Sequence, residues 1–210
     1  MYRGRVTSAP AAKRRNPVDK FEDRRRELAD GALQTLADLG YARTSLRTIA
    51  ENTAYSHGLL HYYFADKVEL ITYCVRRYKA DCVQRYDVAL ADTETPEQLA
   101  IVCGDGLAAT LGDAPLMHRL WYDLRSQSMF EPAFRPDVAE IDLLLQEMIW
   151  RMVAGYAELT ATQPTCSPSE AYAMFDGLFQ QALLRHLDGA DDALDELRRG
   201  ARELLPRLVG

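Results

Sequence analysis

The residues best suited to contact a polyanion lie in one short stretch, HGLLHYYFADK, which begins at His57. His57 and His61 are four residues apart, so on a helix both would lie on one face. Imidazole groups can donate or accept hydrogen bonds at base edges, and a leucine such as Leu59 can pack against a thymine methyl group. Gly58 would let the helix backbone come close to DNA, although glycine inside a helix costs about 1 kcal/mol relative to alanine. The pattern predicts a helix that reads bases in a groove.

A second short helix is predicted just before this one. Leu46, Ile49 and Ala50 are spaced three and four residues apart, which gives a short helix one buried face. The hydroxyl group of Thr44 or Ser45 can cap its N-terminus. The two helices would then be joined by a tight turn.

Capping signals flank the His-rich helix on both sides. Ser56 is placed to cap its N-terminus, and Leu60 and Phe64, four residues apart, would point inward. Asp66 and Glu69 have the spacing of a capping pair for a longer helix that follows. The hydroxyl and ammonium groups of this region are donors of the kind that hold DNA phosphates.

The rest of the chain also reads as helical. Apolar residues recur with a helical period and are separated by Gly and Pro, and no alternating strand pattern is present. The predicted helices are 21–39, 67–90, 97–111, one around 120–124, 141–159, 169–187 and 191–205. We therefore expect an all-α protein with a mobile basic arm (1–17), a three-helix domain (18–67) and a larger helical domain (68–210).

Composition narrows the class of protein further. The chain has 210 residues, 48% of them hydrophobic, and no run approaches the ~18 apolar residues of a membrane span. No secretory leader is recognisable, which favours a bacterial cytoplasmic protein without a membrane partner. The four cysteines form no CxxC pair and are expected to be reduced. Residues 1–70 hold 12 Lys and Arg against 9 Asp and Glu, so we expect a basic head on an acidic body.

Residues 24–70 resemble the N-terminal helix-turn-helix domain of the TetR family of one-component regulators. The matching positions are Gly40, Tyr41, Thr44, Ile49, Ala50, Ser56, Gly58, Tyr63, Phe64, Lys67 and Leu70. The resemblance implies base contacts from Arg47, His57, Gly58, Leu59 and His61. It implies contacts with the DNA backbone from Thr44, Ser45, Tyr62, Tyr63 and Lys67. Ala54 departs from the usual turn glycine, and His61 departs from a frequent tyrosine.

The resemblance also implies a C-terminal domain that dimerises and holds a small molecule. Residues 169–187 carry apolar side chains on two sides, which requires cover on both sides. A two-fold interface is predicted from residues of the last two helices: Tyr172, Phe175, Phe179, Leu183, Leu187, Leu194 and Leu197. A central helix buried inside a monomer is the alternative. The end of the chain also resembles the BetI-like, choline-sensing branch of the family.

A ligand pocket is expected among the middle helices. The candidate lining residues are aromatic, thioether or imidazole side chains: His118, Trp121, Tyr122, Phe130, Met148, Trp150, Met152 and Tyr156. Aromatic faces beside a carboxylate could hold a cationic or quaternary ammonium ligand through cation–π attraction. The alternative for each of these side chains is an ordinary place in the core.

Three functional hypotheses follow. The first is a ligand-responsive repressor that binds a near-palindromic operator as a homodimer and is released by a small effector, with the helix beginning near Lys67 as the lever. The second is a nucleoid-type binder without base preference. The third is an all-α enzyme, which is disfavoured because no nucleophile elbow, metal-ligand set or phosphate-binding glycine loop is found. No cofactor and no metal are expected.

Overall fold

The computed structural model describes residues 17–210, and these residues form an all-helical protein. Its helices in chain order are α1 (Pro17–Leu39), α2 (Leu46–Glu51), α3 (His57–Tyr63), α4 (Lys67–Ala91), α5 (Pro96–Asp113), α6 (Pro115–Gln127), α7 (Arg135–Thr160), α8 (Pro168–Leu187) and α9 (Ala193–Leu204). Two 3₁₀ turns, η1 (Pro132–Phe134) and η2 (Leu205–Leu208), complete them. The arm predicted for residues 1–17 lies outside the described residues, except for Pro17. The all-α class is confirmed.

The predicted caps form at the helix ends. Ser45 accepts a hydrogen bond from the Thr48 amide, and Ser56 accepts one from the Leu59 amide. Asp66 caps α4 by accepting from the Glu69 amide. Gly40 follows α1 with φ of +71°, a left-handed conformation that suits glycine at a helix C-terminus.

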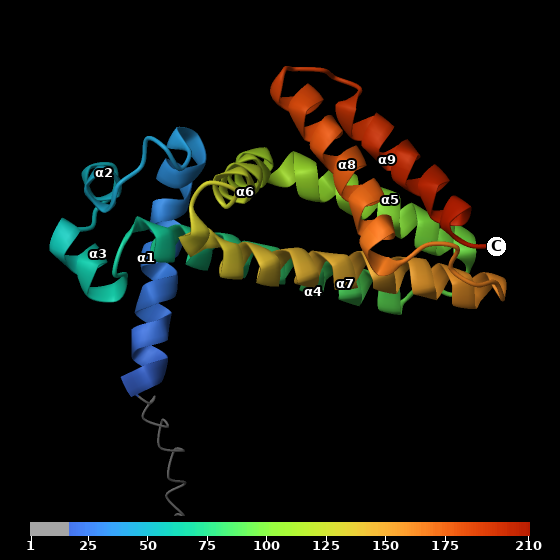
Figure 1. Cartoon of the computed structure of the whole chain (residues 1–210), viewed down its shortest axis with the longest axis horizontal. Coiled ribbons are helices and arrows are strands. Elements are labelled where there is room, and N and C mark those ends of the chain that lie inside the picture. Colours follow the sequence, from blue (N-terminus) through green and yellow to red (C-terminus); the bar gives the residue numbers. More distant parts are fainter. Residues whose placement is uncertain (1–16) are drawn as a thin grey trace, which may run out of the picture.

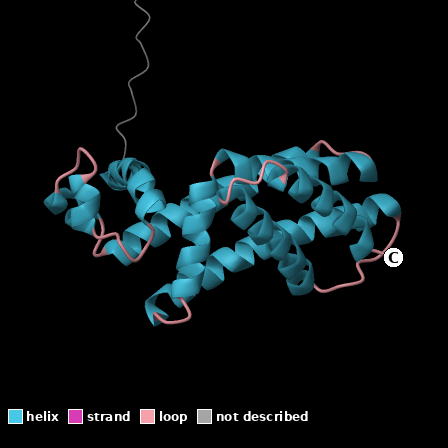
Figure 2. Ribbon diagram, turned by 90° about the horizontal axis from the view of Figure 1, so that it is seen from above, coloured by secondary structure: helices cyan, strands magenta, loops and turns pink. Residues whose placement is uncertain are grey.

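The helices form a three-helix head and a longer body (Figure 1). In the head, α1 supports the short pair α2 and α3, and Leu28, Ile49 and Leu60 are fully buried between them. In the body, α4 and α7 run side by side, and α5, α8 and α9 pack against one another beside them. The two parts are also distinct when the molecule is seen from above (Figure 2).

α6 lies where the head meets the body. It packs against α1 on one side and against α8 on the other. Its apolar face carries Leu120, Trp121 and Leu124, all buried. This short helix is therefore in contact with both parts of the molecule.

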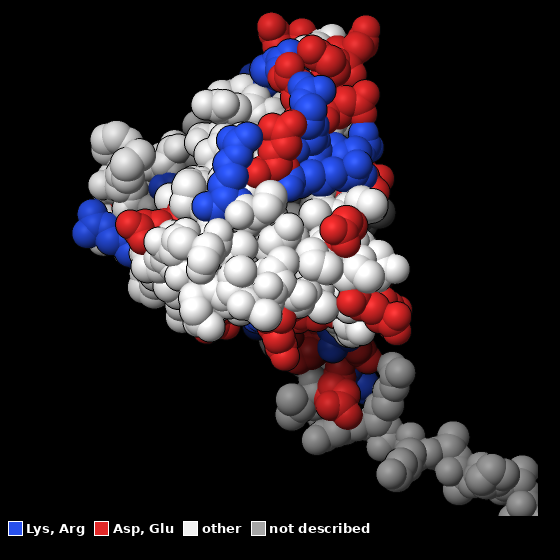
Figure 3. All heavy atoms as spheres, turned by 90° about the vertical axis from the view of Figure 1, so that its right-hand side faces the viewer, with Lys and Arg blue, Asp and Glu red and all other residues white. Residues whose placement is uncertain are grey.

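The end of the body farthest from the head carries charges of both signs in close proximity (Figure 3). Ion pairs join α9 to α5 here, with Arg198 and Arg202 at 2.8 Å and 2.6 Å from the Asp105 carboxylate. Opposite charges that neutralise one another in this way produce no extended field of one sign.

In the described part of the chain, no single helix is both long and apolar enough to cross a membrane. The pair α5 and α6 has the required combined length and hydropathy but is bent by 90° between the two helices.

Candidate nucleic-acid interface and internal cavity

α3 places its two imidazoles in solvent while it is anchored from below. His57 and His61 are exposed, with their ring centroids 4.4 Å apart. Leu60 and Phe64, on the opposite side of α3, are fully buried in the head. The helix therefore presents His57 and His61 outward on a fixed support.

The other candidate base contacts lie around the imidazoles. A Cβ added at Gly58 would meet no atom of the chain within 4 Å, so the packing of this molecule does not require glycine there. Leu59 is half-buried against the head core. The Arg47 side chain on α2 is 81% exposed and forms an ion pair of 3.1 Å with Glu51. All of these residues can be reached from the solvent side of α2 and α3.

The candidate contacts with the DNA backbone differ in how exposed their side chains are. Tyr62 is 71% exposed, whereas the half-buried Tyr63 packs its ring on Phe21 with centroids 4.7 Å apart. The Lys67 ammonium group lies 3.9 Å from the centre of the Tyr41 ring and donates to the Tyr41 carbonyl at 3.4 Å. The Ser45 hydroxyl is exposed and caps α2.

Thr44 does not fit the predicted contact with the DNA backbone. It is only 3% exposed, and its hydroxyl donates to the Gly40 carbonyl at 2.7 Å. This hydrogen bond secures the turn between α1 and α2, so Thr44 has a structural role in the head.

The turn between α2 and α3 is fixed by a residue that sequence analysis did not single out. The Tyr55 hydroxyl donates to the Glu27 carbonyl on α1 at 3.1 Å. A Cβ built on Gly31 would lie 2.5 Å from the Tyr55 ring, so the ring occupies space that only glycine leaves open. Ala54 is not in a left-handed conformation, because Ala161 is the only non-glycine residue with positive φ in the described chain. The strain that a left-handed alanine would bring to this turn is therefore absent.

The distribution of charge corrects one expectation. Residues 17–70 hold 7 Lys and Arg against 9 Asp and Glu, so the folded head itself is not basic. The positive excess of residues 1–70 comes from Arg3, Arg5, Lys13, Arg14 and Arg15, in a segment without acidic residues. Any long-range attraction of the N-terminal part to a polyanion depends on this segment.

Hydrogen bonds connect the head to α6 and to the turn after it. The Tyr41 amide donates to the Asp123 carboxylate at 2.7 Å, and the Tyr41 hydroxyl donates to Glu131 at 2.7 Å. Burial, helped by the nearby Glu131 carboxylate, raises the pKa of Tyr41 to about 12, so its hydroxyl remains a donor. Arg119 donates to the last carbonyls of α1, those of Ala37 and Asp38. A shift of α6 would therefore act directly on α1.

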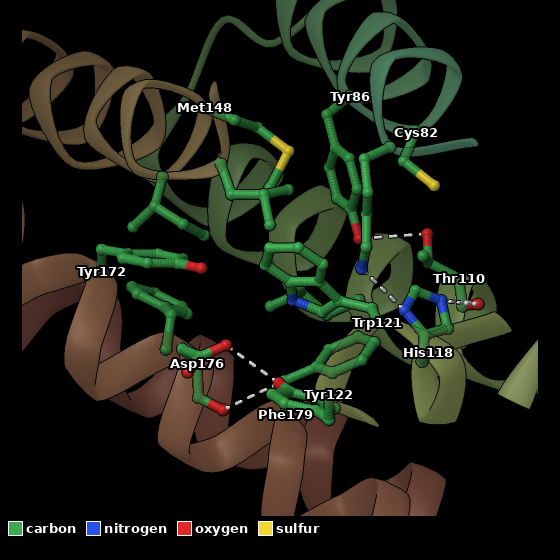
Figure 4. A pocket seen from close by; sticks show the side chains of 15 residues that line it. Cys82, Tyr86, Thr110, His118, Trp121, Tyr122, Met148, Tyr172, Asp176 and Phe179 are labelled. Carbon is green, nitrogen blue, oxygen red and sulfur yellow. Dashed lines mark hydrogen bonds between the residues drawn. The ribbon is translucent and has the colours of Figure 1, made fainter. Parts of the chain in front are cut away.

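The body contains an internal cavity bounded by α4, α5, α6, α7 and α8, with about 50 Å³ of free space (Figure 4). Its wall includes four of the predicted pocket residues: His118, Trp121, Tyr122 and Met148. It also includes residues of α4 and α8 that were not predicted: Lys79, Cys82, Tyr86, Tyr172, Phe175, Asp176 and Phe179. The cavity is mainly apolar, with a few polar groups at defined places.

The other four predicted pocket residues do not line this cavity. Phe130 is 79% exposed in the turn after α6, and Met152 is fully buried beside Cys103. Trp150 and Tyr156, on α7, are half-buried against the core outside the cavity. The aromatic and thioether pattern did not separate the faces of α7, so it could not identify which residues turn toward the cavity.

A buried lysine and a buried histidine form one polar corner of the cavity. The His118 ring donates from Nε2 to the Thr110 carbonyl at 3.0 Å, so its Nδ1 is free to accept. The Lys79 ammonium group donates to that Nδ1 at 3.1 Å. Burial lowers the pKa of Lys79 to about 8, and burial together with the Lys79 charge lowers the pKa of His118 to about 2. At neutral pH the lysine is charged and the histidine is neutral.

Acidic groups at the opposite corner are already paired. Asp176 accepts from the Tyr122 hydroxyl at 2.9 Å (Figure 4) and from Arg125 at 2.6 Å. Asp142 accepts from the Tyr172 hydroxyl at 2.7 Å and lies 3.5 Å from Arg125. These carboxylates are therefore satisfied within the protein.

The side chains predicted to form the dimer interface are mostly buried within this protomer. Five of them are buried: Tyr172, Phe175, Phe179, Leu183 and Leu197. Leu194 is half-buried, and Leu187 is 39% exposed. These residues therefore belong largely to the core and to the cavity wall. The free face of α8 is a different one, with Met174 38% exposed, Leu184 61% exposed and open space above Gly177.

Lys79 carried a sequence signal that was missed. It continues a helical series of buried residues on α4, with Val75 before it and Cys82 and Tyr86 after it. A single lysine in such an apolar series indicates a buried charge. Arg125 and Asp176 gave no comparable signal, because their pairing depends on the packing of α6 against α8.

No group of three or more His, Cys, Asp or Glu side chains is arranged to hold a metal ion anywhere in residues 17–210. All four cysteines are unpaired thiols, three of them buried.

Comparison with known proteins identifies relatives of both the sequence and the fold. Residues 28–74 match the family model described as bacterial regulatory proteins, tetR family. The chain is 27% identical over 171 residues to the HTH-type transcriptional regulator BetI of Brucella anthropi, an alignment that covers 80% of this chain and 84% of the relative. It is 31% identical over 117 residues to BetI of Burkholderia thailandensis, with 54% and 59% covered.

Solved structures share the fold over nearly the whole chain. A transcriptional regulator from Saccharomonospora viridis, solved in complex with choline, matches with a TM-score of 0.73 at 16% identity, covering 90% of this chain and 98% of that one. The regulator FadR from Bacillus subtilis, solved with stearoyl-CoA, matches with a TM-score of 0.72 at 17% identity, covering 86% and 96%. At these identities the likeness concerns the fold.

Proposed function

We propose that the chain is a transcriptional regulator of the TetR family, which represses transcription by binding an operator through α3 and leaves the operator when a small molecule enters the body. Residues 18–67 would act as the DNA-binding domain and residues 68–210 as the regulatory and dimerisation domain. α4 begins at the boundary and belongs to the packing of both.

The observation that carries the DNA-binding proposal is the orientation of α3. Its buried Leu60 and Phe64 hold the helix on the head, while His57 and His61 project into solvent. A helix supported in this way can enter a major groove with side chains directed at base edges. We assign base contacts to Arg47, His57, Gly58, Leu59 and His61, and backbone contacts to Ser45, Tyr62, Tyr63 and Lys67.

A homodimer would use the free face of α8. Met174, Gly177, Gln181 and Leu184 lie on one side of the helix, and the two apolar side chains among them are exposed. Two copies related by a two-fold axis would bury this face and place two heads on a near-palindromic operator. Leu184→Glu should then yield a monomer in light-scattering measurements, and an unchanged dimer would reject this interface.

Ligand response would travel from the cavity to the head through α4 and α6. α6 carries His118 and Trp121 on its cavity side, and Arg119 and Asp123 on the side that holds Ala37 and Tyr41. A ligand that favours a shifted position of α6 would change the placement of α1 and so the spacing of two heads. Two solved structures with the same fold, one in complex with choline and one with stearoyl-CoA, support a small-molecule response.

Selection of duplexes from a random pool tests the proposed function. A sequence-specific regulator should enrich a near-palindromic sequence with two half-sites. A pool without any enriched sequence, with binding that depends on salt alone, would instead support a nucleoid-type binder.

A further inference from the structure

We propose that the effector is a small monocarboxylate with a compact apolar body, and that Lys79 binds its carboxylate group. The inference rests on the proposed ligand-responsive function and names the chemical class that the cavity recognises. It replaces the cationic ligand that the aromatic residues alone suggested.

The first observation is a buried positive charge without a counterion. Lys79 is 5% exposed, and its ammonium group has three donors but one hydrogen-bond partner, the neutral His118. No Asp or Glu among residues 17–210 forms an ion pair with it. An unpaired buried ammonium group is costly, so proteins retain one mainly where a partner completes the site.

The second observation is another buried donor in the cavity wall. Trp121 is 1% exposed and lines the cavity, and its indole N–H has no hydrogen-bond partner. The indole lies between Tyr172 and His118, and its nitrogen is directed to the side of Tyr172 and Asp176 (Figure 4). The Lys79 nitrogen lies 5.6 Å from the centre of the Trp121 ring. The indole N–H therefore points away from Lys79, and the two unsatisfied donors lie at different places in the cavity wall. A wall with unsatisfied donors favours a ligand that accepts, and a carboxylate offers two oxygens that only accept.

The groups that could repel a carboxylate are neutralised. Asp176 is the only carboxylate residue in the described cavity wall, and it is held by Tyr122 and Arg125. A cationic ligand would instead lie next to the Lys79 charge without a free carboxylate to receive it. The charge arrangement therefore selects an anion.

The size and lining of the cavity define the rest of the ligand. Around the two donors the wall is formed by apolar side chains such as Leu107, Leu145 and Ile149. The free space of about 50 Å³ is enough for on the order of four water molecules. A short aliphatic acid fits this space better than a long acyl chain, which would require the helices to separate.

Calorimetric titration of the full chain with matched probes tests the proposal. The carboxylates are propionate, isobutyrate and benzoate, each compared with its neutral amide and with choline as the cation. We expect at least one carboxylate to bind about 10- to 100-fold more tightly than its amide. Lys79→Met should remove that preference, and Lys20→Met, an exposed lysine on α1, should leave it intact.

A second variant keeps the test decisive if Lys79→Met does not fold. Lys79→Gln retains a polar side chain that can donate to His118 but carries no charge, and it should weaken carboxylate binding by about 10-fold, with little effect on the amide. Equal binding of acids and amides, preferred binding of choline, or carboxylate binding that survives both substitutions would overturn the proposal.

Failure of the ligand class is separable from failure of the proposed function. If the protein enriches a specific duplex but binds no carboxylate in preference to its amide, the ligand class is wrong and the regulator remains. If it binds carboxylates through Lys79 but enriches no duplex, the DNA-binding function is wrong and the site remains.

Discussion

Replacing Lys79 with methionine should stabilise the ligand-free protein at neutral pH, although it removes a charged residue from the proposed site. Methionine has a similar length and carries no charge into the core. The lysine is only 5% exposed, and this burial lowers its pKa from 10.5 to about 8. A buried ion that is replaced by an apolar group of similar volume often leaves a protein more stable.

The magnitude follows from linkage between protonation and folding. Below pH 8 the lysine is protonated in both states, so the folded protein carries the whole cost, about 3 kcal/mol for a shift from 10.5 to 8. Between pH 8 and 10.5 the folded state releases the proton while the unfolded state keeps it, so the stability of the wild type rises with pH. At pH 10 the remaining cost is about 1 kcal/mol.

Titratable groups near Lys79 do not obscure this pH dependence of stability. The His118 ring stays neutral over the whole range, because its pKa is lowered to about 2. Burial raises the pKa of Cys82, and it raises the pKa of Tyr78 and Tyr86 well above their usual range. The charges of Arg125, Asp142 and Asp176 are held in ion pairs.

Urea denaturation of the wild type and of Lys79→Met at pH 7 and pH 10 measures the effect. The lost hydrogen bond to His118 costs about 1 kcal/mol at both pH values, so the variant should gain about 2 kcal/mol at pH 7 and nearly nothing at pH 10. A stability difference that is the same at both pH values would mean that Lys79 carries no desolvated charge.

Further outcomes concern the head, the end of α7 and the N-terminal segment. Gly31→Ala should destabilise the head by about 1 to 3 kcal/mol in thermal denaturation, because the new methyl group overlaps the Tyr55 ring. Gly58→Ala, in open space, should instead stabilise it by up to about 1 kcal/mol while weakening duplex binding; tighter binding would show that the backbone does not approach DNA. Ala161→Gly should add about 1 kcal/mol of stability, since Ala161 has φ of 52°. Deletion of residues 1–16 should reduce the salt dependence of duplex binding by up to about 4 units of slope, and an unchanged slope would remove these residues from phosphate contact.

Local sequence signals were sufficient to locate the elements of the head. Ser56 and Asp66 cap α3 and α4 as their positions indicated, and Gly40 ends α1 in a left-handed conformation. Such caps depend on a few consecutive residues, so they can be read without knowledge of the tertiary structure. The start of α1 at Pro17, before the apolar pattern begins, reflects a polar first turn with proline, which periodicity does not detect.

The cavity was less accessible to prediction because it depends on how distant helices turn relative to one another. The residues of α7 face the cavity, the core or the surface in turn. Met148 therefore lines the cavity and Trp150 does not, although both side chains are of a type expected in a ligand pocket. The apolar residues of α8 predict either a dimer face or a buried central helix, because the sequence cannot tell a partner from the protein's own α6 and α7. Phe175 and Phe179 cover the protein's own cavity.

One affinity ratio shows whether the exposed imidazoles of α3 distinguish bases. The affinity for the selected duplex divided by that for a scrambled duplex should be measured at fixed salt for the wild type and for the double variant His57→Ala/His61→Ala. We expect the ratio to fall by about 10-fold or more while the affinity for the scrambled duplex and its salt dependence persist. A ratio that the double variant leaves unchanged would contradict base reading by α3.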